Sequence, residues 1–184
     1  WMIKRWHIPI CGFTQSLDRV SGIERLWSKL RSHVSHDVSL IPPQRWKSDW
    51  KSIAEFIWRL RPESGVPDVR IYAYSWGCGH GFVSLSKELR KRGIPVRFAV
   101  LCDPVYHSWV RPWRAMLFSP AIKIPDNVRE VYWFRQNQNK PMATDLKATG
   151  DTIIHDPVWL PRDHQYMDDA AEFHNRCVLL DLEK

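Results

Sequence analysis

The sequence predicts a three-layer α/β/α fold with a mainly parallel central sheet, and three observations support this prediction. Strand-like and helix-like segments alternate along the chain, as they do when crossover helices join parallel strands. Residues 71–74 and 98–102 are continuous apolar runs, which is typical of strands covered on both faces. The length of 184 residues is enough for one domain with a sizeable core. We therefore expect residues 1–184 to form a single domain.

Six segments have the apolar, β-branched or aromatic composition of strands. They span residues 6–11, 38–41, 69–74, 96–102, 128–134 and 152–155. Turn signals such as Pro42-Pro43 and Asp103-Pro104 end two of them. We expect strand 69–74 to lie at the centre of the sheet. Ligands should then gather at the carboxyl ends of the strands, as they do in other open α/β sheets.

Four segments have the pattern of helices packed against such a sheet. The first begins at Ser21 or Gly22 and keeps a 3.6-residue apolar period up to Val34. The others cover residues 50–58, 82–92 and 166–177. We expect Asp168 or Asp169 to cap the start of the last helix, because a carboxylate there can accept the free backbone N–H groups.

Ser75 lies at the junction of strand 69–74 and the third helix, in the sequence Ala-Tyr-Ser-Trp-Gly. Small residues two before and two after a serine let the two backbones approach closely, and the hydroxyl then projects above the sheet edge. The helix N-terminus behind it favours negative charge. This pattern resembles the nucleophile elbow of the α/β-hydrolase superfamily, although Ala73 stands where that family most often has Gly. The alternative is an ordinary serine in a βα turn.

A serine hydroxyl becomes a good nucleophile when a base removes its proton and a carboxylate orients that base. Asp103 directly follows strand 96–102, where the alternative is a turn or N-cap role. His164 precedes the last helix, and His155 at the end of the last strand is the rival base. The order Ser, Asp, His matches the order in the α/β-hydrolase superfamily. We therefore predict a catalytic triad of Ser75, Asp103 and His164, with the imidazole between the other two side chains.

Acyl transfer also needs donors for the oxyanion, which are commonly two backbone N–H groups. The resemblance implies one donor in the residue after the nucleophile, Trp76, and one after an early strand, where Gly12-Phe13 forms a turn. We predict the amides of Phe13 and Trp76 for these roles.

The substrate itself is expected to meet aromatic side chains near the nucleophile. Residues 107–124 are the candidate cover of the site, and the alternative is a loop that simply packs on the sheet. The predicted substrate-binding residues are Tyr74, Trp109, Trp113 and Phe118.

The resemblance covers residues 6–177 and implies a minimal α/β-hydrolase fold. Within the superfamily, the sequence resembles a compact, lidless serine esterase, thioesterase or lipase-like member. It implies hydrolysis of a small-molecule or lipid-like carboxylic ester or thioester through a seryl acyl-enzyme, without a cofactor or metal. The alternative is a hydrolase-like fold that acts as a non-catalytic binding protein.

The charge and cysteine content restrict the remaining classes. The net charge is +7 and there are 11 tryptophans, but the basic residues are scattered and no nucleic-acid motif is present, so nucleic-acid binding is not expected. No apolar run is long enough to cross a membrane, and no signal peptide is seen. Four cysteines without metal-type spacing are expected to be buried free thiols in a reducing, cytoplasmic setting: Cys11, Cys78, Cys102 and Cys177.

Overall fold

The computed structural model describes residues 4–13, 20–33, 38–63, 65–106 and 120–183, and it confirms the predicted fold class. The main sheet has seven strands in the order β2-β1-β3-β4-β6-β8, with β9 also paired to β6. The strands are β1 (Arg5–Ile10), β2 (Val38–Leu40), β3 (Asp68–Tyr74), β4 (Val96–Cys102), β6 (Val128–Arg135), β8 (Ile153–Ile154) and β9 (Val158–Trp159). All of these pairings are parallel, and β3 lies centrally, as predicted.

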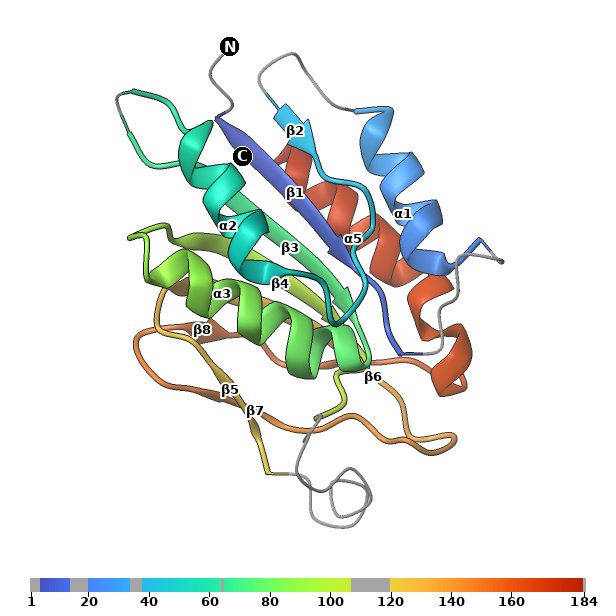
Figure 1. Ribbon diagram of the computed structural model, residues 1–184. Helices are drawn as coiled ribbons and strands as arrows, with labels where there is room; N and C mark the ends of the chain where they lie inside the picture. Colours follow the sequence, from blue (N-terminus) through green and yellow to red (C-terminus); the bar gives the residue numbers. More distant parts are fainter. Residues whose placement is uncertain (1–3, 14–19, 34–37, 64, 107–119, 184) are drawn as a thin grey trace.

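Helices cover both faces of this sheet (Figure 1). The described helices are α1 (Gly22–Arg31), α2 (Trp50–Arg59), a π-helix (Gly77–Phe82) that runs into α3 (Val83–Arg90), a 3₁₀-helix (His164–Asp169) and α5 (Ala171–Leu182). Helices α2 and α3 pack on one face, and α1 and α5 pack on the other. The sheet is therefore the middle layer of three.

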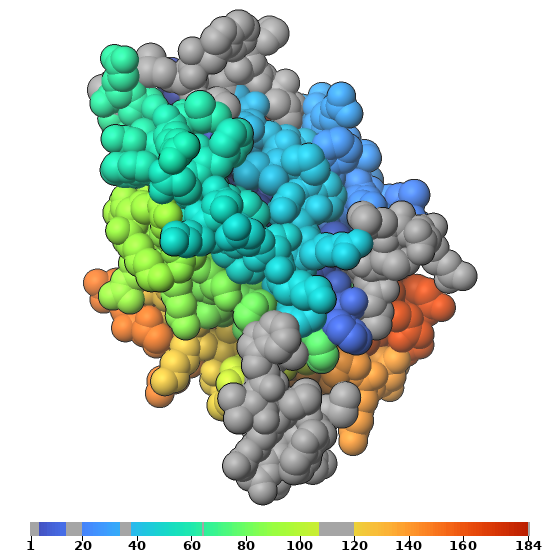
Figure 2. All heavy atoms as spheres, viewed as in Figure 1, coloured from blue at the N-terminus to red at the C-terminus, as the bar shows by residue number. Residues whose placement is uncertain are grey.

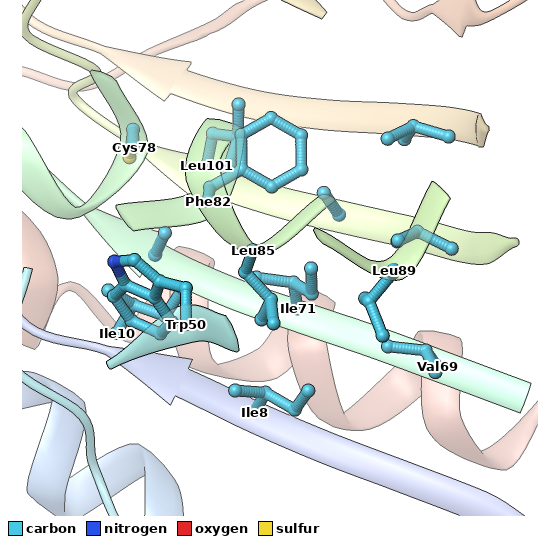
Figure 3. Packing of buried hydrophobic residues seen from close by; sticks show 14 of the residues in the cluster. Ile8, Ile10, Trp50, Val69, Ile71, Cys78, Phe82, Leu85, Leu89 and Leu101 are labelled. Atoms are coloured by element: carbon cyan, nitrogen blue, oxygen red, sulfur yellow. The ribbon is translucent and has the colours of Figure 1, made fainter. Parts of the chain in front are cut away.

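Alternation along each strand divides the core into two clusters, one on each face. On the α2/α3 face the strands contribute mainly aliphatic side chains, which meet aromatic and leucine residues of the helices (Figure 3). This cluster includes Ile8, Ile10, Val69, Ile71, Leu101, Trp50, Phe82, Leu85 and Leu89. On the α1/α5 face the strand residues are more aromatic, and the cluster includes Tyr72, Tyr74, Phe98, Phe134, Leu26, Leu30 and Phe173. Full burial of such a side chain stabilises the fold by about 1.5–3 kcal/mol relative to exposure.

The helix behind the elbow begins earlier than the sequence predicts, at Gly77 instead of residue 82. Glycines are poor helix formers, so the segment before residue 82 carries no helical signal. Close packing against β1 explains why a glycine occupies position 77. A Cβ atom at Gly77 would lie 2.7 Å from the Cys11 carbonyl oxygen and 2.9 Å from that of Ile10. The backbone approach at this position therefore requires glycine.

The predicted start of the first helix is confirmed, whereas the capping prediction for the last helix is wrong. Ser21 caps α1, and its side chain accepts a hydrogen bond from Glu24 N. Helix α5 instead has Ala170 at its N-cap, without a side-chain hydrogen bond. Asp168 accepts a hydrogen bond from Ile23 N at 3.2 Å, so this carboxylate serves the start of α1. The 3₁₀-helix places it there, and sequence spacing alone does not show that contact.

Three short strands lie outside the prediction. Strands β5 (Ile122–Ile124) and β7 (Leu146–Ala148) form a separate parallel pair, and β9 adds to the edge of the main sheet. Segments of two or three residues are too short to show a strand period. The four cysteines are free and buried, as predicted. Within the described residues, no helix combines the length and apolar character needed to span a membrane.

Candidate active site

The backbone at Ser75 has an uncommon conformation, with φ at 53°. Its N–H donates to the Cys102 carbonyl at 3.0 Å, which continues the β3–β4 ladder, while its own carbonyl accepts from Cys78 N at 3.0 Å, which starts the helix. Strand and helix thus meet at one residue. A left-handed conformation costs a non-glycine residue about 1–3 kcal/mol, so the surrounding hydrogen bonds must hold it.

Three side chains predicted from the sequence lie in one hydrogen-bonded row at the carboxyl ends of β3 and β4. The distance from Ser75 Oγ to His164 Nε2 is 2.9 Å, and from His164 Nδ1 to Asp103 Oδ2 it is 2.5 Å. The Asp103 side chain is fully buried, and that of His164 is 12% exposed. A buried carboxylate is stable here only because it is paired and hydrogen-bonded.

Backbone groups fix Asp103 in its place. Its φ is 44°, in the left-handed region that aspartate tolerates better than most residues. The Asp103 N–H donates to the Phe134 carbonyl at 2.8 Å, and Oδ1 accepts from Gln136 N at 3.3 Å. Strand β6 and the turn after it therefore hold the carboxylate toward His164.

His164 is held through both its backbone and its ring. Its N–H donates to Asn139 Oδ1 at 2.7 Å, and its carbonyl accepts from the Tyr74 hydroxyl at 2.7 Å. The Tyr74 ring stacks on the imidazole, with 5.2 Å between ring centres. Burial raises the pKa of Tyr74, so its hydroxyl remains a donor. Sequence reasoning missed Asn139, because one asparagine among several polar loop residues gives no signal.

The turn after β1 passes directly over the elbow. A Cβ atom at Gly12 would lie 3.1 Å from Ser75 Cβ and 2.8 Å from Tyr74 Cδ1, so only glycine allows this approach. Phe13 follows, 57% exposed, with its ring 4.3 Å from that of Trp76. Both residues predicted for the oxyanion hole therefore lie beside Ser75. The donor role of their amides stays a prediction.

The other candidates lie elsewhere or outside the described residues. His155 stacks on Tyr132 at 4.1 Å between ring centres, and its Nε2 lies 3.3 Å from Glu130 Oε2. Tyr74 is only 3% exposed, and its role as a substrate-binding residue stays a prediction. The remaining predicted substrate-binding residues, Trp109, Trp113 and Phe118, lie outside the described residues.

The buried cysteines around Ser75 offer little competing chemistry. Burial raises the pKa of the Cys11 thiol to about 12, and it raises the pKa values of Cys78 and Cys102 well above their usual range. These thiols therefore stay protonated and are poor nucleophiles. In the part of the chain that the structure describes, no group of three or more His, Cys, Asp or Glu residues could hold a metal ion.

Comparison with solved structures agrees with this architecture. No family model matches the chain, and no curated protein matches it in sequence. RedJ with a PEG molecule bound in its active site is 14% identical, with a TM-score of 0.52 over 99% of this chain and 90% of that one. The RedJ thioesterase from the prodiginine biosynthetic pathway of Streptomyces coelicolor is 13% identical, with a TM-score of 0.51 over 99% of this chain and 86% of that one. The chain has a hydrolase-like α/β fold. At this identity the likeness concerns the fold alone, and the chemistry must be argued from the site.

Proposed function

We propose that the protein hydrolyses a carboxylic ester or thioester through a seryl acyl-enzyme, with Ser75 as nucleophile, His164 as base and Asp103 as the orienting acid. One observation carries the proposal: the imidazole of His164 lies between Ser75 Oγ, at 2.9 Å, and the buried Asp103 carboxylate, at 2.5 Å. Both distances fall within hydrogen-bond reach for proton transfer.

The geometry supports a two-step reaction. His164 Nε2 accepts the Ser75 proton as Oγ attacks the carbonyl carbon, and Asp103 keeps the Nδ1 proton directed away from the serine. The amides of Phe13 and Trp76 then stabilise the oxyanion, a contribution typically worth about 3–4 kcal/mol for a single donor. His164 passes the proton to the leaving oxygen or sulfur, so the acyl group remains on Ser75. Water activated by the same imidazole releases the acid.

Ester and thioester substrates differ in the leaving group and share the same acyl-enzyme. The fold likeness to the RedJ thioesterase supports including thioesters in the proposal. A small-molecule or lipid-like substrate fits this chemistry, and no cofactor is needed for it. The alternative function is binding without turnover, which would leave Ser75 unreactive.

The replacement Ser75→Ala provides the test. We expect turnover of p-nitrophenyl acetate and of an acetyl thioester to fall by about 10⁴–10⁶-fold, because removal of a triad nucleophile leaves only residual catalysis. The wild-type protein should react covalently with a fluorophosphonate probe, and the variant should not. Circular dichroism of the variant checks that it is folded. Equal turnover in the two folded proteins, or no labelling of the wild type, would contradict the proposal.

A further inference from the structure

Three aromatic side chains from three separate segments meet beside Ser75. Phe13 follows β1, Trp46 lies between β2 and α2, and Trp76 follows the candidate nucleophile. The distances between ring centres are 4.3 Å for Phe13–Trp76, 5.3 Å for Trp46–Trp76 and 5.9 Å for Phe13–Trp46. We call these three residues the aromatic wall. It begins at the two residues whose amides are proposed to bind the oxyanion, so it adjoins the position of the reacting carbonyl.

The segment that carries Trp46 is fixed to β1. The backbone carbonyl of Gln44 accepts a hydrogen bond from Cys11 N at 2.8 Å, and its backbone N–H donates one to the Pro9 carbonyl at 2.9 Å. Gln44 also forms an isolated parallel bridge with Ile10, the last residue of β1, and Figure 2 shows the segment and the turn after β1 together on one face of the molecule. The Trp46 side chain is 7% exposed, whereas that of Phe13 is 57% exposed. Trp46 is therefore the buried part of the wall, which supports Phe13 from behind, and Phe13 is its exposed part.

The aromatic wall and the candidate base reach Ser75 through different segments of the chain. His164 stacks on Tyr74, whose ring belongs to the core cluster under α1 and α5. The Trp46 carbonyl is 3.2 Å from a Cβ position at Gly81, which also contacts Trp50 of the α2/α3 cluster. Because His164 must protonate the leaving group, the leaving group has to face the imidazole. The acyl group then points away from the imidazole, and the aromatic wall offers it an apolar surface next to Ser75.

We propose that the aromatic wall is the acyl-binding subsite and that it favours aryl or similarly bulky apolar acyl groups over acetyl. This proposal rests on the proposed function. Stacked and edge-to-face contacts with Phe13 would stabilise an acyl group that contains an aromatic ring, whereas an acetyl group is too small to make them. The described residues thus supply an apolar subsite on the elbow and its neighbouring turns.

Phe13→Ala tests the subsite, and Phe56→Ala is its matched control. Both residues are phenylalanines with similar exposure, 57% and 52%, but Phe56 lies on α2 against Trp6. The Phe13 backbone amide remains in the variant. The readout is the ratio of kcat/KM for p-nitrophenyl phenylacetate to that for p-nitrophenyl acetate, which share one leaving group. We expect Phe13→Ala to lower this ratio about tenfold, and Phe56→Ala to leave it unchanged.

Varying the leaving group on a constant acetyl group completes the kinetic test. Phe13→Ala should not change the ratio of kcat/KM for phenyl acetate to that for ethyl acetate. A changed leaving-group ratio together with an unchanged acyl ratio would assign the wall to the leaving group and overturn the proposal. Trp46→Leu, with its folding checked by thermal melting, should reproduce the Phe13→Ala result, because the replacement removes the support of the Phe13 ring.

A binding measurement separates the subsite from the reaction. In the Ser75→Ala background, quenching of tryptophan fluorescence reports binding of methyl phenylacetate and methyl acetate without chemistry. We expect methyl phenylacetate to bind more tightly than methyl acetate, and Phe13→Ala to remove about tenfold of that preference. Preferential binding in a protein without esterase activity would contradict the proposed function and keep the subsite. No preference for methyl phenylacetate would overturn the subsite, whether or not the wild type hydrolyses esters.

Discussion

Two strained residues sit at the ends of adjacent strands, and together they define the candidate site. Ser75 has φ of 53° and Asp103 has φ of 44°, and each such non-glycine conformation costs about 1–3 kcal/mol. Both residues could be predicted as site residues from the sequence, since each is a polar residue directly after an apolar strand. Asn139 and Trp46 could not be predicted as site residues, because their roles arise from loops that come together only in three dimensions.

The choice between two histidines gives the first prediction at this scale. His164→Ala should reduce kcat/KM by about 10⁴–10⁶-fold, because without the base Ser75 keeps its proton. His155→Ala should leave turnover within about twofold of wild type, since His155 contacts Glu130 and Tyr132 instead of Ser75. Steady-state kinetics with p-nitrophenyl acetate measures both variants. The assignment of the base fails if the effects of the two replacements are reversed.

At the scale of elements, the packing of the π-helix against β1 holds the elbow and the predicted oxyanion turn together. The long strands of the main sheet, β1, β3, β4 and β6, were predictable because their apolar runs are long and several of their ends carry turn signals. The start of the helix at Gly77 was not, because the glycines that permit close packing also remove the helical pattern. The cap of α5 was mispredicted because Asp168 accepts its hydrogen bond from the start of α1, a contact that depends on the tertiary structure.

A methyl group at Gly77 should separate these two elements. The added Cβ atom would lie 2.7 Å from the Cys11 carbonyl oxygen, so the turn at residues 12–13 has to shift away from Ser75. We expect Gly77→Ala to lower kcat by about 100-fold, which is comparable to the loss of one oxyanion donor. Gly93→Ala is the control, because Gly93 has φ of 68° and open space around it, so its replacement affects stability without moving the elbow. A kcat loss of the same size in both variants would trace the effect to general destabilisation.

At the scale of the whole molecule, the candidate catalytic residues and the buried ion pairs lie at opposite ends of the sheet. Ser75 follows the last residue of β3, whereas Asp68 begins that strand. There, Arg70 is fully buried and pairs with Asp68 at 2.8 Å and with Asp181 of α5 at 2.5 Å. Removing one member of a buried pair leaves the other uncompensated, so this cluster fixes how α5 docks on the sheet. The sequence showed the charges, but the pairing of Arg70 with Asp181, 111 residues away, depends on the topology.

The buried His7 makes the stability of this cluster depend on pH. Burial lowers the pKa of His7 to about 4, against the attraction of Asp181, and Arg70 and Arg5 also lower it while Asp68 raises it. The unfolded chain therefore binds a proton near pH 6.5 that the folded chain does not bind until about pH 4. Stability is thus lost as the pH falls through this window, by about 3 kcal/mol in total.

Urea unfolding at pH 7 and pH 4.5 should show this loss in the wild type. His7→Gln should lose less stability over the same interval, because glutamine does not titrate and can still meet the Tyr72 hydroxyl that lies 2.9 Å from His7 Nδ1. His174, whose pKa burial also lowers, contributes equally to both proteins, so the difference isolates His7. An identical loss of stability in the two proteins would show that another group carries the pH dependence.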